Sequence, residues 1–326
     1  MTGMPLSRDK ATAALADPPV RDTVAPNGIT LDFNVQQIED VVIDGPPELL
    51  ARDLMSPFVW HDPDGRFGMM VRAVVAPGAP LTDTGQIWAG WSDDGVKFKM
   101  LPRPVIVPGP DVSDAGGVED PTVVIDPDGG YVVYYTGVLA DMAHGDLCYA
   151  SGMAIDRLEK RGIALASSKS QGNTKEATVE RTDDGRWRLF YEYAVEQSSR
   201  IGLAIGPGVA GPWTEMPPPL LPRENNWDDW HLSTGPLLTH PEALPVMFYN
   251  GATHDARWRI GWVAFDRDYG RVVARGIQPL ITPPPVPDRS APDISFAASS
   301  VMVDHEIWLY YSLEDRRLAR ARIRRS

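Results

Sequence analysis

The chain repeats one pattern five times, and this repetition constrains its fold more than any other feature. Each copy holds two short apolar runs separated by a turn, which predicts a β-hairpin. The copies start 64, 56, 59 and 63 residues apart, as SPFVWHDPDGRFGMMVRA at Ser56, DPTVVIDPDGGYVVYYTG at Asp120, EATVERTDDGRWRLFYEY at Glu176, GPLLTHPEALPVMFYNGA at Gly235 and ASSVMVDHEIWLYYSLED at Ala298. A weaker pair of strand-like runs follows most hairpins, so each repeat supplies about four strands.

Five four-stranded antiparallel sheets predict an all-β fold, a five-bladed β-propeller around a central channel, because radial closure removes most exposed sheet edges. The last repeat ends at Ser326 and has little room for a fourth strand. We therefore expect the segment GITLDFNVQ, which begins at Gly28, to complete the last blade. The predicted organisation is a single propeller domain over residues 28–326, preceded by a partly irregular extension over residues 1–27.

Composition narrows the classes of function. A net charge of −13 argues against a binder of the nucleic-acid backbone, and we expect neither nucleic acid nor a membrane as a partner. With Cys148 as the single cysteine, no intrachain disulfide can form, and the absence of a signal-like or spanning apolar run makes a cytoplasmic location the default expectation. The six histidines show no zinc-type spacing, so we expect no metal and no cofactor. The oligomeric state is left open.

Equivalent positions of a propeller converge on its channel, so differences among the repeats indicate which residues can face a ligand. The first strands begin with Ser56, Asp120, Glu176, Gly235 and Ala298. The returning strands place beside them Arg72, Thr136, Glu192, Asn250 and Ser312. A ring of polar groups at the ends of apolar strands suits a small polar ligand.

Two carboxylates, Asp120 and Glu176, stand on neighbouring blades. Such a pair can cleave a glycosidic bond if one carboxyl is protonated and donates to the leaving oxygen while the other activates water or attacks. The alternative is that each carboxylate accepts backbone hydrogen bonds where its strand begins, as Asp often does before Pro. The residues alone do not decide between these two interpretations.

The five hairpins resemble those of glycoside hydrolase family 130 and, more distantly, family 43. The most specific element is Val118-Glu119-Asp120-Pro121, which is similar to the family 130 segment that carries the general acid. The resemblance implies that Asp120 is that acid, that Arg72 binds sugar, and that Lys175 and Glu176 line the site. It also implies inverting transfer of a β-mannoside to phosphate or water, with Glu176 as base or binding carboxylate.

The chain departs from the phosphorylase pattern of family 130 at two positions. Thr122 follows the Asp-Pro pair where an arginine is typical, and Asn250 replaces a histidine in Tyr249-Asn250-Gly251. Because an anion site needs several convergent cations or backbone donors, these changes favour hydrolysis. Arg72, Lys175 and His231 keep phosphorolysis open. Family 43 fits less well, because Ser56 stands where its catalytic base is expected.

The segment ENNWDDWHLSTG, residues 224–235, brings aromatic and polar side chains to the fourth blade. We expect one of Trp227 and Trp230 to be structural and the other to reach the site, with Trp230 and His231 as substrate-binding candidates. The predicted function is therefore a glycoside hydrolase with catalytic residues Asp120 and Glu176. The alternatives are a phosphorylase of the same family and a propeller that binds carbohydrate without catalysis.

Overall fold

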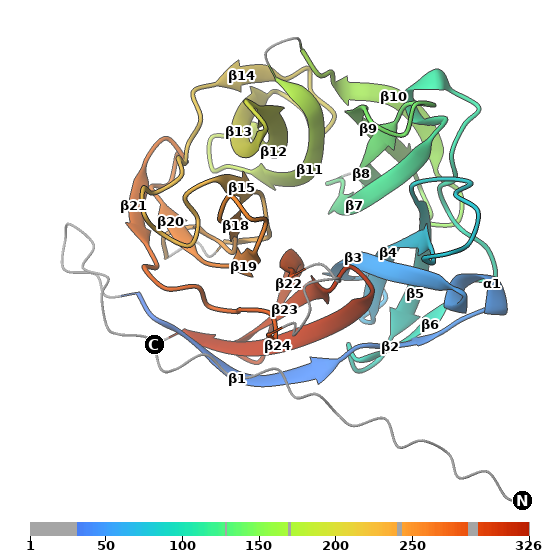
Figure 1. The fold of residues 1–326 in the computed structure, drawn as a ribbon, viewed down its shortest axis with the longest axis horizontal. Helices are drawn as coiled ribbons and strands as arrows, with labels where there is room; N and C mark the ends of the chain where they lie inside the picture. Colours follow the sequence, from blue (N-terminus) through green and yellow to red (C-terminus); the bar gives the residue numbers. More distant parts are fainter. Residues whose placement is uncertain (1–30, 128, 169–170, 240–242, 286–292, 326) are drawn as a thin grey trace, which may run out of the picture.

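The structure, a computed structural model, describes residues 31–325 except 128, 169–170, 240–242 and 286–292. Its sheets are arranged radially around a central channel, as Figure 1 shows, which confirms the predicted five-bladed β-propeller. The predicted N-terminal extension and the first residues of the predicted domain lie outside the described residues.

The first three blades follow the predicted four-strand plan. Blade one comprises β3 (Arg52–His61), β4 (Phe67–Val75), β5 (Gln86–Ser92) and β6 (Lys97–Met100), with β2 (Val42–Asp44) added parallel to β6. Blade two comprises β7 (Gly117–Ile125), β8 (Tyr131–Val138), β9 (Gly145–Gly152) and β10 (Glu159–Leu165). Blade three comprises β11 (Gly172–Arg181), β12 (Trp187–Val195), β13 (Ser198–Gly206) and β14 (Thr214–Met216).

The fourth blade is divided into two small sheets instead of one continuous sheet. One holds β15 (His231–Ser233), β18 (Asn250–Ala252) and β19 (Trp258–Ile260), and the other β16 (Leu237–Leu238), β17 (Val246–Met247), β20 (Val263–Phe265) and β21 (Val272–Arg275). The break in the innermost strand falls at Gly235 and Pro236. A Cβ atom at Gly235 would lie 1.8 Å from the carbonyl oxygen of Phe248, so only glycine allows this close approach.

The fifth blade joins the two ends of the described chain. It comprises β22 (Ser295–Val303), β23 (Glu306–Leu313), β24 (Arg317–Arg325) and β1 (Phe33–Asp40). Strand β1 pairs antiparallel with β24, from Phe33 opposite Arg325 to Asp40 opposite Ala319, which confirms that the N-terminal segment completes this blade. Two short helices, α1 (Pro47–Leu50) and the 3-10 helix η1 (Val112–Asp114), lie in connections. Within the described residues, no helix has both the length and the apolar character needed to cross a membrane.

The hydrophobic core consists of five clusters, and each fills the space between two adjacent blades. Between blades one and two, for example, Trp60 and Met70 pack with Val133 and Tyr135. Each layer combines aliphatic and aromatic side chains, and alternate residues of a strand face opposite neighbours, so a strand can contribute to the layers on both of its sides. Every blade is therefore held on both sides by its neighbours.

Side-chain hydrogen bonds also link the innermost strands around the channel. The hydroxyl of Thr122 donates to the carbonyl oxygen of Ala177 at 2.6 Å, and that of Thr178 donates to the carbonyl oxygen of Gly235 at 2.9 Å. Across the next interface the amide of Asn250 donates to the carbonyl oxygen of Ala297 at 3.0 Å. These bonds position the blades at the radius where the candidate site lies.

The circular closure generates the first prediction. Phe33 of β1 is 1% exposed, and its ring centroid lies 5.3 Å from Phe248 and 5.2 Å from Trp262. We expect Phe33→Ala to lower the free energy of unfolding by about 3–5 kcal/mol, because it opens a cavity between blades four and five. Urea denaturation measures this change. Val42→Ala on exposed β2 is the control, with an expected change below about 0.5 kcal/mol; equal effects of the two substitutions would contradict a packed closing strand.

Candidate active site

The innermost strands of blades one, two and three each carry a bulge at the predicted channel position. Ser56, Asp120 and Glu176 have φ of 52°, 49° and 51°, in the left-handed region that side-chain-bearing residues rarely adopt. The strand register shifts at the same places, between Met55 and Phe58 in blade one and equivalently in the others. A bulge turns one side chain away from the normal alternation. The same strained geometry in three blades indicates a shared functional demand.

The three bulged residues face a small cavity at the channel. Its other walls include Thr234, Gly235 and Ala298. Blades four and five thus contribute glycine and alanine at the positions where blades two and three contribute carboxylates. The cavity has carboxylates on one side and small residues on the other, and its volume of about 10 Å³ is that of roughly one water molecule.

Arg72 organises the carboxylates of blade two. Its Nη2 atom lies 2.5 Å from Glu119 Oε1 and its Nη1 atom 3.3 Å from Asp120 Oδ1, and Nε and Nη2 also donate to the carbonyl oxygen of Thr84. The hydroxyl of Ser56 donates to Asp120 Oδ1 at 2.6 Å. The Arg72 side chain is 18% exposed, so these interactions act largely away from bulk water. They fix the orientation of the Asp120 carboxyl.

The carboxyls of Asp120 and Glu176 are hydrogen-bonded to each other. Burial opposes ionisation of Asp120, yet Arg72, Lys175 and the Ser56 hydroxyl hold the pKa of its carboxyl below the usual value. Burial, and then the charge of Asp120, raises the pKa of the Glu176 carboxyl well above its usual value. Within the pair, Glu176 therefore holds a proton more tightly than Asp120 does.

This geometry differs from the acid–base pair expected from the sequence. Two carboxyls in hydrogen-bonded contact cannot hold an attacking water between them, which requires a separation of roughly 6.5–9.5 Å in an inverting enzyme. Glu176 instead lies where it can exchange a proton with Asp120. The sequence could not predict this contact, because it depends on how two bulged strands approach each other.

Three further predicted residues form a second group on blade three and at its border with blade four. Lys175 Nζ lies 3.4 Å from Glu192 Oε1, and the hydroxyl of Ser199 donates to the same carboxylate oxygen at 2.7 Å. The backbone N–H of Ser199 donates to His231 Nδ1 at 3.1 Å, so this nitrogen carries no proton. Burial lowers the pKa of His231, which agrees with a neutral imidazole. Lys175 is 34% exposed and retains N–H donors for a ligand.

The two tryptophans of the fourth-blade segment occupy different environments. Trp227 stacks on Tyr249 at a centroid distance of 5.5 Å and donates through Nε1 to the carbonyl oxygen of Ile277, so it is part of the blade interior. Trp230 is partly exposed and lies against His254 at 4.5 Å. Both tryptophans are partly buried; Trp227 packs against the core between blades three and four, whereas Trp230 contacts His231 and His254.

Asn250 is fully buried, at 0% exposure. Its Nδ2 atom donates to the carbonyl oxygens of Thr234 and Ala297, and its Oδ1 atom accepts from the backbone N–H of Ala297 at 2.7 Å. The predicted substrate-binding residue thus has its amide engaged by the backbone of two blades. The Asn250 side chain therefore joins the backbone of blade four to that of blade five.

Two carboxylates that sequence reasoning did not select also belong to this site. Glu119 pairs with Arg72, and Asp315, from the turn between β23 and β24, interacts electrostatically with Arg72, Asp120 and Lys175. Glu119 could have been found from its place beside Asp120. Asp315 is the last residue of the fifth repeat copy, but it lies three residues beyond Ser312, the strand-end position that was used to define the predicted ring. Within the described residues, no cluster of three or more His, Cys, Asp or Glu side chains has the geometry of a metal site.

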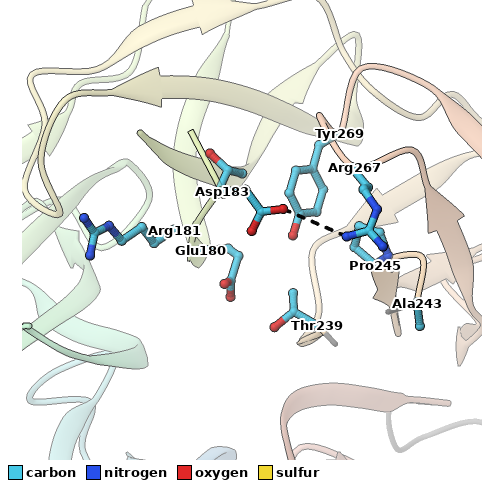
Figure 2. Close-up of a pocket in the computed structure, with 9 residues that line it drawn as sticks. Glu180, Arg181, Asp183, Thr239, Ala243, Pro245, Arg267 and Tyr269 are labelled. Carbon is cyan, nitrogen blue, oxygen red and sulfur yellow. Dashed lines mark ion pairs between the residues drawn. The ribbon is translucent and has the colours of Figure 1, made fainter. Parts of the chain in front are cut away.

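A larger pocket lies between blades three and four, near the β11–β12 turn and away from the carboxyl pair (Figure 2). Glu180, Thr239 and Tyr269 line it, and Arg267 Nη1 lies 3.9 Å from Asp183 Oδ2 at its rim. Burial raises the pKa of Glu180 to about 7. Glu180 follows Glu176 by four residues on β11, or about 13 Å along the strand, so this pocket is separate from the candidate active site.

Bulged carboxylates at the channel of a five-bladed propeller place the chain in the class of propeller proteins with an acidic central site. Residues 70–325 match the sequence model of a family described as β-1,4-mannooligosaccharide phosphorylase, and the chain belongs to glycoside hydrolase family 130. The predicted resemblance to this family is therefore confirmed. A comparison with curated protein sequences finds no match.

Several solved structures share the fold. A glycosyl hydrolase from Bacteroides ovatus is 21% identical, with 83% of this chain and 84% of that one covered and a TM-score of 0.70. A β-1,2-mannobiose phosphorylase from Listeria innocua, in complex with β-1,2-mannobiose, is 17% identical, with coverage of 88% and 90% and a TM-score of 0.68. A third structure is 19% identical, with coverage of 97% and 95% and a TM-score of 0.69. Its description says that the family of mannoside phosphorylases contains hydrolases that target β-1,2 mannosidic linkages in Candida mannan.

The Arg72 network generates the second prediction. We expect Arg72→Ala to lower the free energy of unfolding by about 3–5 kcal/mol, because it leaves the Glu119 carboxylate buried without its cation. Adding Glu119→Gln to Arg72→Ala should recover part of this loss. Urea denaturation of the two single variants and the double variant measures the coupling. Strictly additive effects would show that the ion pair has no part in stability.

The pocket of Figure 2 generates the third prediction. The pKa of Glu180 is raised from 4.5 to about 7 in the folded protein, so its stabilising contribution is full below pH 4.5 and is lost as the pH rises through 7. We expect Glu180→Gln to raise the free energy of unfolding at about pH 8 by roughly 1–2 kcal/mol and to leave it nearly unchanged at about pH 4.5. Denaturation at both pH values tests this, with exposed Glu215→Gln as control. An equal effect at the two pH values would refute the raised pKa.

Proposed function

We propose that this protein is an inverting glycoside hydrolase acting on a β-mannoside. Its family supplies the substrate class, since the family description names a mannooligosaccharide and the structural relatives include proteins named for mannosides. The family contains both phosphorylases and hydrolases, so the choice of acceptor depends on the site of this chain. Polar groups that converge on rigid strand ends also suit a polar substrate such as a carbohydrate.

The charge balance of the site is the observation that carries the choice of water over phosphate. Two cations, Arg72 and Lys175, interact with five carboxyl groups, here called the channel carboxyls: Glu119, Asp120, Glu176, Glu192 and Asp315. Arg72 is engaged by Glu119, Asp120 and a carbonyl oxygen, and Lys175 is paired with Glu192. A phosphate dianion would enter a site whose charge is already negative, which opposes binding.

The proposed chemistry begins with protonation of the leaving group. Asp120 lies at the cavity and transfers a proton to the glycosidic oxygen as the bond from that oxygen to the anomeric carbon breaks. Glu176, whose carboxyl has a raised pKa, supplies this proton to Asp120 through their hydrogen bond. A water oxygen attacks the anomeric carbon from the opposite face and loses its own proton to a base.

Product analysis tests this function directly. The protein is incubated with β-1,2- and β-1,4-linked mannobiose, with and without inorganic phosphate. We expect free mannose in both conditions, with the first-formed product in the α configuration by NMR. Release of mannose 1-phosphate only when phosphate is present would identify a phosphorylase, for which the exposed part of Lys175 offers N–H donors. Binding without turnover would identify a carbohydrate-binding propeller.

The role of Asp120 gives the fourth prediction. We expect Asp120→Asn to lower kcat by at least about 100-fold while substrate binding, measured by calorimetry, stays within a few fold, because the substitution removes the proton donor but keeps the side-chain shape. The loss should be smaller for aryl β-mannosides with acidic leaving groups, which need less protonation. Asp64→Asn, an exposed turn residue, is the matched control. An equal loss for good and poor leaving groups would refute the acid role.

A further inference from the structure

The turn between β23 and β24 carries two acidic residues at positions of positive φ. Glu314 and Asp315 have φ of 56° and 50°, and the backbone N–H of Arg316 donates to the carbonyl oxygen of Leu313 at 3.1 Å. Turns with two positive φ values strongly prefer Asn and Gly. The turns at Glu196–Gln197 and Asp304–His305 have the same two positive φ values, so the conformation itself is that of an ordinary hairpin turn in this protein. The turn at Glu314–Asp315 is distinguished by the charge interactions of Asp315 with Arg72, Asp120 and Lys175.

This turn is attached to the catalytic part of the channel. Ser312, three residues before Asp315, accepts through its hydroxyl oxygen from the backbone N–H of Ser56 at 2.8 Å, and Ser56 in turn donates to Asp120. The backbone N–H of Glu314 donates to the carbonyl oxygen of Ile294 at 3.1 Å, which anchors the turn to the start of β22. Strand β23 thus sets the position of Asp315 relative to Asp120.

Asp315 differs from the other channel carboxyls in its partners. Glu119 forms an ion pair with Arg72, and Asp120 and Glu176 are hydrogen-bonded to each other. Glu192 accepts a hydrogen bond from Ser199 and pairs with Lys175. For Asp315, no hydrogen bond or ion pair forms with any residue in the described part of the chain. Its charge interactions are with Arg72, Asp120, Lys175 and the neighbouring Arg316. Its oxygens are therefore available to accept a hydrogen bond from a water or a substrate hydroxyl.

Blade five lies across the channel from blades two and three, which carry the Asp120–Glu176 pair (Figure 1). An inverting mechanism needs its acid and base on opposite faces of the sugar ring, with room for water beside the base. Burial raises the pKa of the Asp315 carboxyl, which strengthens it as a proton acceptor once it is ionised. Among the channel carboxyls, Asp315 is the one that lies on the blade opposite the Asp120–Glu176 pair and whose oxygens form no hydrogen bond or ion pair within the described residues.

We infer that Asp315 is the catalytic base, an assignment that rests on the proposed glycoside hydrolysis. As the water oxygen bonds to the anomeric carbon, one of its O–H bonds breaks and the proton passes to Asp315. At the same time the Asp120–Glu176 pair gives a proton to the departing oxygen. Solvent returns the proton from Asp315 to the pair after the products leave, so the enzyme is restored without a co-reactant.

The test compares Asp315→Asn with Asp120→Asn on two substrates, a mannobiose and β-mannosyl fluoride. Fluoride leaves without a general acid, so Asp120→Asn should regain much of its activity on the fluoride, whereas Asp315→Asn should lose at least about 100-fold in kcat on both substrates. Added azide should restore turnover of Asp315→Asn and form an α-mannosyl azide. Glu314→Gln, the same change one residue earlier, is the matched control and should keep wild-type activity. Asn tolerates a positive φ, so Asp315→Asn should fold, which a melting curve checks.

The outcomes separate this inference from the proposed function. If the wild-type protein hydrolyses the mannosides and the kcat of Asp315→Asn stays within about threefold of the wild-type value, the assignment of Asp315 as base is wrong. The proposed hydrolase function would be unaffected by that result. A rise in KM with unchanged kcat would likewise overturn the base and make Asp315 a hydroxyl-binding residue. A wild-type protein that turns over none of these substrates, or turns them over only with phosphate, would overturn the proposed hydrolysis and the base with it.

Discussion

The hydrogen bonds that join the innermost strands around the channel are the constraint on which the site depends. Thr122 and Thr178 each donate to the backbone of the next blade, and Asn250 binds the backbone of blades four and five. These bonds fix neighbouring strands at one radius, and the hydrophobic layers between blades prevent them from separating. The bulges at Asp120 and Glu176 can persist because the surrounding structure holds both ends of each strand.

That rigid frame explains the unusual electrostatics of the site. Several carboxyl groups share a confined space with Arg72 and Lys175, and this crowding, together with burial, raises the pKa of the Glu176 carboxyl. Ionising both members of the pair would place two negative charges in contact inside the protein. The same crowding supports the proposal that Glu176 passes a proton to Asp120 and that water is the acceptor.

Much of the architecture could be predicted from the chain alone. The five hairpins, the strand that begins at Phe33 and closes the last blade, and the pairing of strand starts with strand ends all follow from alternating apolar residues and turn residues. The division of the fourth blade was not predictable in this way. It depends on how closely Gly235 approaches the backbone of Phe248, which is a distance between segments and not a local preference.

The sequence by itself determined the propeller, the family, and the placing of Asp120 and Glu176 on adjacent blades, because repeats and local patterns are encoded in neighbouring residues. Only the tertiary structure decided that these two carboxyls are hydrogen-bonded, that Asn250 has its amide bound to the backbone, and that Asp315 interacts electrostatically with Arg72, Asp120 and Lys175. The physical reason is that protonation and hydrogen-bond satisfaction depend on distances of a few ångströms between blades. Those distances are set by the packing of the closed ring and by no single segment.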